Sequence, residues 1–91
     1  MKHYNIFISG RVQRIGFRFS AMNTAYKIGV TGFIQNQPDG KLYLEAEGEE
    51  ENLQKFIQWC KIGPLGAKVT KAEIVEGELQ HYTAFDIRRS G

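Results

Sequence analysis

Residues 30–47 read VTGFIQNQPDGKLYLEAE, and they decide the fold because they hold a complete strand–turn–strand pattern. Residues 30–35 are rich in β-forming side chains. The turn at 36–40 carries Pro38, which presets φ, and Gly40, which supplies a positive φ. Residues 41–47 then alternate, with Leu42, Leu44 and Ala46 on one face and Tyr43, Glu45 and Glu47 on the other. This alternation predicts an antiparallel hairpin with one apolar face and one face in water.

A helix is predicted directly after the hairpin, opening near Gly48. Its apolar side chains recur at the spacing of one helical face, at Leu53, Phe56, Ile57 and Cys60. The glutamates at 49–51 match the positive end of the helix dipole, and Gly63-Pro64 ends the helix. Cys60 is the only cysteine, which excludes an internal disulfide and a cysteine-rich zinc site. Its place on the apolar stripe predicts a core residue and not a nucleophile.

The residues before the hairpin predict a strand at 4–8, a loop at 11–16 and a helix from 17 or 18 to 28. Gly29 is expected to cap the end of this helix. We expect the helix to bury one apolar face, formed by Phe19, Met22, Ala25, Tyr26 and Ile28.

The residues after the second helix predict two closing strands, at 69–75 and 83–88, separated by a turn near Gly77. His3 is expected in the frayed N-terminal residues and His81 in the turn before the last strand. Both are therefore interpreted as surface residues without a part in chemistry.

The predicted order is β-α-β-β-α-β with one added strand. It indicates the α+β class, specifically a ferredoxin-like two-layer sandwich whose mostly antiparallel sheet has two helices on one face. Because this fold hosts RNA binders, metal carriers, ligand-binding modules and enzymes, it does not by itself name a function.

Size and charge narrow the class of protein. The 91 residues, 42% of them hydrophobic, predict a single domain over residues 1–91. No stretch matches a signal peptide or a membrane span, so we expect a soluble, cytoplasmic protein. Twelve basic and ten acidic residues, a net charge of +2, are too balanced to favour nucleic acid as a partner. No pattern demands more than a monomer.

Two segments carry chemical information. The first is the strand–helix loop Gly10–Arg18, where main-chain N–H groups, a helix N-terminus and the guanidinium of Arg18 could together hold an anion. The second is Asn36, at the end of the strand that begins the hairpin. Its amide could orient a water molecule, or it could cap its own turn. The predicted topology lets both segments lie at the same end of the sheet.

These residues resemble the signatures of a known family. Gly-Arg-Val-Gln at 10–13 with Gly-Phe-Arg at 16–18 is similar to the signature loop of the acylphosphatases. Lys27-Ile28-Gly29-Val30, followed by Gly32-Phe33, Asn36 and Asp39-Gly40, resembles that family's second signature. The resemblance extends over essentially the whole chain, including the final segment Phe85–Arg88.

The resemblance implies a hydrolase that splits the carboxyl–phosphate anhydride of small-molecule acyl phosphates into a carboxylate and inorganic phosphate. It implies that Arg18 and the main-chain N–H groups of the loop hold the phosphoryl group, the loop residues being Val12, Gln13, Arg14, Ile15, Gly16 and Phe17. It implies that Asn36 positions the attacking water. No metal, cofactor or covalent intermediate is implied.

The chain departs from the family pattern at two places, Arg14, where the family has Gly, and Gln35, which is often Lys. Arg14 leaves open a second hypothesis, a phosphate or acyl-phosphate binding module with little or no turnover. A third hypothesis is an RNA-binding module of the RRM type, because residues 14–19 mimic its aromatic motif. That motif belongs on the third strand of the sheet, whereas here it precedes the first helix.

Overall fold

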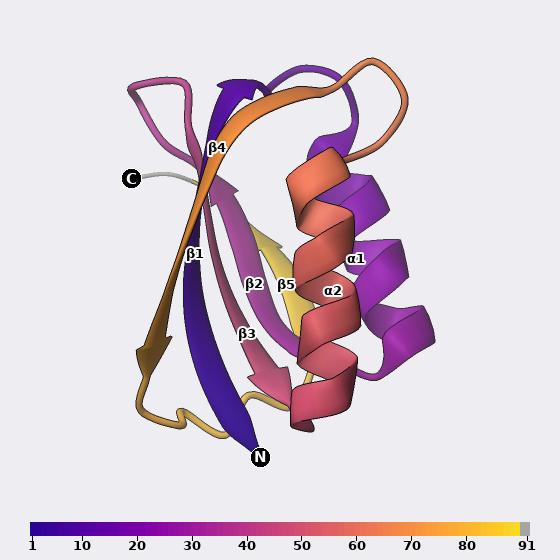
Figure 1. Ribbon diagram of the computed structural model, residues 1–91, viewed down its shortest axis with the longest axis vertical. Helices are drawn as coiled ribbons and strands as arrows, with labels where there is room; N and C mark the ends of the chain where they lie inside the picture. The colour runs from indigo at the N-terminus through magenta and orange to yellow at the C-terminus, as the bar shows by residue number, and fades with distance from the viewer. Residues whose placement is uncertain (90–91) are drawn as a thin grey trace.

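The structure is a computed structural model, and it describes residues 1–89. Its elements are β1 (Lys2–Arg11), α1 (Phe17–Ile28), β2 (Thr31–Asn36), β3 (Leu42–Gly48), α2 (Glu50–Ile62), β4 (Lys68–Gly77) and β5 (Phe85–Arg88). The strand order is β4-β1-β3-β2-β5, with β5 parallel to β2 and every other pair antiparallel. Both helices pack on one face of the sheet (Figure 1). The predicted α+β sandwich is confirmed, and β5 is the added strand.

The core lies between the sheet and the helices, and α2 supplies the apolar face that its spacing predicts. Leu53, Phe56, Ile57 and Cys60 are all buried there. Burial raises the pKa of the Cys60 thiol, which makes it a structural side chain and a poor nucleophile.

The inner face of α1 differs from the prediction. Its buried residues are Phe17, Ala21 and Ala25, whereas Phe19 is 65% exposed and Tyr26 is 62% exposed. Phe17, Ala21 and Ala25 follow one another at i, i+4 and i+8, and Phe19 lies about 200° around the helix from Phe17. The two alanines allow the helix to approach its neighbours closely, so the large aromatic side chains at 19 and 26 point away from the core.

The other face of the sheet is less open to water than the alternation of residues 41–47 predicts. His3, expected at a frayed end, is part of β1 and only 3% exposed. Its Nδ1 lies 2.7 Å from Oε2 of Glu47, which is 1% exposed. The β4–β5 connection, at the bottom of Figure 1, brings the main-chain N–H groups of Gln80 and Tyr82 to the same carboxylate. His81 is exposed, as expected.

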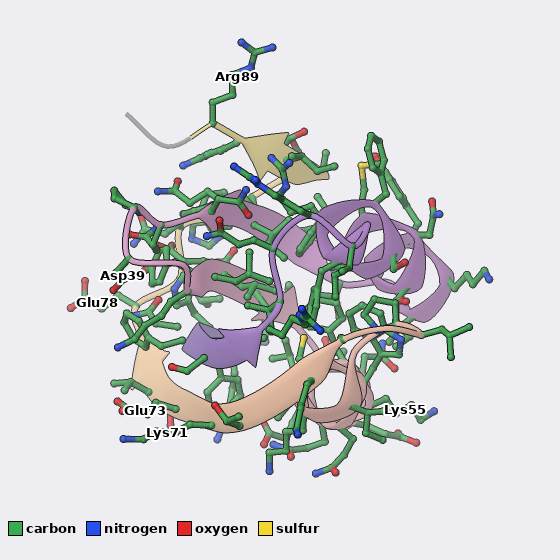
Figure 2. The ribbon with its side chains drawn as sticks, turned by 90° about the horizontal axis from the view of Figure 1, so that it is seen from above. Asp39, Lys55, Lys71, Glu73, Glu78 and Arg89 are labelled. Atoms are coloured by element: carbon green, nitrogen blue, oxygen red, sulfur yellow. The ribbon has the colours of Figure 1, made fainter. Side chains whose placement is uncertain are left out.

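The topology brings two chain segments to one end of the sheet. β3 runs antiparallel to both β1 and β2, so β1 and β2 run in the same direction and end on the same side. The loop after β1 and the turn after β2 both lie at that end (Figure 1). Figure 2 looks down on it, with Asp39 marking the β2–β3 turn and the loop running from β1 to α1.

Candidate functional site

A cavity of about 140 Å³ lies at this end of the molecule. It is lined by Val12, Gln13, Arg14, Gly16, Phe17, Arg18, Phe19 and Asn36. The loop after β1 supplies one wall and the first turn of α1 another, while Asn36 comes from the last position of β2. The two segments that the sequence singles out therefore meet at one cavity.

The loop has the backbone of an anion-binding nest. Arg14 has φ 64° and Gly16 has φ 77°, whereas Ile15 between them has negative φ. When φ alternates between positive and negative along a loop, successive main-chain N–H groups point toward the same side. Among residues 1–89, no oxygen accepts a hydrogen bond from the main-chain N–H groups of residues 13–18. These donors are available to a ligand, and those of the first helical turn carry partial positive charge.

Two arginines give the cavity its charge. Arg18 lies in the first turn of α1 and is half-buried, while Arg14 is exposed on the loop. Within residues 1–89, neither guanidinium forms an ion pair with a carboxylate. The lining contains no carboxylate. A small anion would therefore meet uncompensated positive charge together with free N–H donors.

Asn36 faces the cavity because of the strand period. Ile34 is fully buried in the core, and Asn36, two residues further on, shares its face of β2. The Oδ1 atom of Asn36 is buried and accepts no hydrogen bond from any group of residues 1–89. A buried amide oxygen without a donor is costly, so such an atom indicates a place for a bound water or ligand.

The alternative role for Asn36, capping its own turn, is not the one observed. Within the described part of the chain, Asp39 performs that task, since its Oδ1 accepts a hydrogen bond of 3.0 Å from the N–H of Lys41. Asn36 is thus left with an acceptor that the turn does not use.

The structure brings to the cavity every site residue proposed from the sequence except Ile15, whose partly buried side chain packs against the core. Sequence reasoning missed Phe19, which it assigned to the core. The signal was present in the alanines at 21 and 25, which mark a closely packed face on the opposite side of α1. The residues 14–19 that mimic an RNA-binding motif lie in the loop and α1, not on β3.

Residues 1–89 hold no group of three or more His, Cys, Asp or Glu side chains that could bind a metal ion. None of the helices within residues 1–89 has the length and apolar character needed to cross a membrane.

A strand–loop–helix cradle of free N–H groups on a ferredoxin-like sandwich, with an arginine in the first helical turn, is typical of proteins of the α+β class that bind phosphate. Comparison with known proteins is more specific. The acylphosphatase family model matches residues 4–87. An acylphosphatase from Archaeoglobus fulgidus is 39% identical over 82 residues, covering 90% of this chain and 92% of that protein. One from Acaryochloris marina is 42% identical, covering 90% and 88%.

The solved structures agree. The crystal structure of acylphosphatase from Bacillus subtilis superposes with a TM-score of 0.94 at 36% identity, covering 97% of this chain and 99% of that one. The chain belongs to the acylphosphatase family.

Proposed function

We propose that this chain hydrolyses acyl phosphates by in-line attack of a water held by Asn36 on a phosphoryl group held by Arg18 and the loop. As a member of the acylphosphatase family, the chain is a hydrolase, and its substrates are small-molecule acyl phosphates. The observation that carries the proposal is the buried, unpartnered Oδ1 of Asn36, which lines the same cavity as the free N–H groups and Arg18.

The phosphoryl group would be bound by the loop. Its oxygens accept hydrogen bonds from N–H groups in the segment from Val12 to Phe17 and from the guanidinium of Arg18. These donors are fixed before the substrate arrives, so they can stabilise the charge of a loose phosphoryl-transfer transition state with little reorganisation. This charge neutralisation needs no metal ion or cofactor.

The water would be oriented by Asn36. Its Oδ1 accepts one hydrogen bond from the water, which leaves an oxygen lone pair directed at phosphorus. The new oxygen–phosphorus bond forms as the bond to the acyl oxygen breaks, and the carboxylate leaves with its electron pair. The water's proton passes to a phosphate oxygen, because the cavity lining contains no group suited to act as a general base. A carboxylate is a good leaving group, so positioning supplies most of the catalysis.

Two alanine variants test the roles of Arg18 and Asn36 separately. Arg18→Ala should nearly abolish turnover of acetyl phosphate and weaken competitive inhibition by inorganic phosphate, because it removes a charged partner of the phosphoryl group. Asn36→Ala should lose turnover and still bind phosphate, because its role is with the water. Retention of kcat within about threefold in Asn36→Ala, well under 1 kcal/mol of barrier, would contradict the water-positioning role.

The wild-type chain supplies the control. Its turnover of acetyl phosphate should persist in excess chelator. Phosphate binding without any turnover would instead favour a binding module that has lost catalysis through Arg14.

The remaining features of the proposal concern the whole chain. We propose that residues 1–91 work as a single domain and as a cytoplasmic monomer, without nucleic acid or membrane as a partner. Size-exclusion chromatography with light scattering at the assay concentration tests the oligomeric state.

A further inference from the structure

Gln13 joins the two halves of the site through its side chain. Its carboxamide nitrogen donates to the main-chain oxygen of Gln37 at 2.9 Å and to that of Lys41 at 3.0 Å. Both acceptors belong to the β2–β3 turn, and Gln37 directly follows Asn36. The main chain of Gln13, in contrast, belongs to the phosphate-binding loop.

The turn does not need Gln13 to close. The N–H of Gln37 donates to the oxygen of Lys41 at 2.8 Å, and the N–H of Gly40 donates to the oxygen of Gln37 at 3.1 Å. Each carbonyl therefore already has a partner within the turn, and Gln13 uses its second lone pair. Asp39 adds a further internal hydrogen bond to Lys41.

The carboxamide of Gln13 therefore links the loop after β1 to a turn that its own hydrogen bonds already close. Among residues 1–89, the two hydrogen bonds of Gln13 are the only ones that join residues 12–16 to residues 37–41. Gln13 is half-buried and lines the cavity, and its side chain reaches from the loop that would hold phosphorus to the turn that follows the strand end that would hold the water.

We propose that Gln13 is a positioning residue, which sets the distance between the phosphate-binding loop and Asn36. The proposal rests on the function proposed above. In-line attack requires the water and the phosphorus atom to be held at a defined separation, and misplacement by about 1 Å costs on the order of a hundredfold in rate. Gln13 acts on that separation through the turn, without contacting the water.

Two variants test this role by different routes. Gln13→Met keeps the length of the side chain and removes both N–H donors, while Gln13→Asn keeps the carboxamide and shortens its reach by one methylene. Both should lower kcat for acetyl phosphate about ten- to a hundredfold. Both should leave the inhibition constant of inorganic phosphate within about threefold, because the N–H groups of the loop and Arg18 remain in place.

The matched controls are Gln37→Met and Gln37→Asn. Gln37 is the same residue type on the other side of the contact, and its side chain makes no hydrogen bond within the described residues, so its carbonyl can still accept from Gln13. These variants should keep kcat within about twofold of wild type.

Other outcomes of these experiments would contradict the proposal. A kcat within threefold of wild type in either Gln13 variant would overturn the proposal, and so would an equal loss of turnover and phosphate affinity. Failure of both Gln13 variants to unfold cooperatively would overturn it as well, since the role would then be structural. A wild-type chain that binds phosphate but does not turn over acetyl phosphate would contradict the proposed function itself.

Discussion

At the scale of one residue, the backbone and the side chain of Arg14 have opposite effects on phosphate binding. The family resemblance implies that the loop needs a residue with positive φ here, and the structure gives Arg14 a φ of 64°. A residue with a Cβ in this region costs on the order of 1 kcal/mol relative to glycine. Its guanidinium adds positive charge at the cavity, but the side chain is exposed, so its attraction for an anion is weakened by solvent.

We expect the backbone effect to be the larger one. Arg14→Gly should tighten phosphate binding and raise kcat/KM for acetyl phosphate several-fold, because the loop would no longer be strained in the conformation that wraps phosphate. Steady-state kinetics with phosphate as competitive inhibitor measure both quantities. A clear fall in kcat/KM would show that Arg14 is itself a phosphate ligand.

At the scale of elements, the sequence predicted most of what positions the site. The alternation in residues 41–47 and the spacing along α2 report local periods, and both correctly predicted the side chains that face the core, although the outer face of β3 is less open to water than expected. The loop was predicted because Gly16 and Arg18 stand between a strand and a helix. The burial of His3 could not be predicted, because it depends on Glu47 in β3 and on main-chain donors at 80 and 82, far away in the sequence.

The same limit explains the inner face of α1. The pattern of large apolar residues favoured Phe19 and Tyr26, whereas the buried face is formed by Phe17 and two alanines. A helix that packs close to its neighbours selects small side chains, and this depends on the interhelical contact and not on hydrophobicity alone. The hydrogen bonds of Gln13 were likewise invisible, since they join residues 24 and 28 positions apart.

Two carboxylates of β3 hold the segment between β4 and β5 to the sheet: Glu45, which accepts a hydrogen bond from the Tyr82 hydroxyl, and the more deeply buried Glu47. Burial by itself raises the pKa of Glu47, but the N–H of Gln80, the ring of His3 and the N–H of Tyr82 outweigh it, so the pKa lies below its ordinary value of 4.5. The unfolded chain then binds a proton at a higher pH than the folded chain does. The stabilisation is complete above the ordinary pKa and is lost as the pH falls through the folded pKa.

Glu47→Gln should therefore lower the free energy of unfolding at pH 7 by about 2 kcal/mol or more, since a buried acceptor of three donors loses its charge. The difference from wild type should shrink as the pH falls below about 4. Urea unfolding across this range measures it. Glu76→Gln, at an exposed position of β4, is the control and should change stability by less than about 0.5 kcal/mol. A difference that stayed constant down to pH 2 would show that Glu47 stabilises by packing and not by charge.

At the scale of the whole molecule, the acid-sensitive contact and the cavity lie at opposite ends of β1. His3 is the second residue of the strand, and Val12 follows its last. The nine residue steps from His3 to Val12, at about 3.3 Å each, span about 30 Å, which matches the longest dimension of the molecule, 30 Å. Acid should therefore act on stability through Glu47 and on catalysis only through the substrate.

The pH dependence of kcat follows from the cavity lining. Its polar side chains are two guanidiniums and two carboxamides, and it contains no carboxylate, imidazole or thiol. The proposed mechanism uses no general base, so kcat for acetyl phosphate should vary by less than about twofold between about pH 6 and pH 9, after correction for spontaneous hydrolysis. Glu47→Gln should share this flat profile at temperatures where it is folded. A tenfold change of kcat per pH unit at either end of this range would mean that a titrating group takes part in the reaction. It would contradict the proposal that the water's proton passes to a phosphate oxygen.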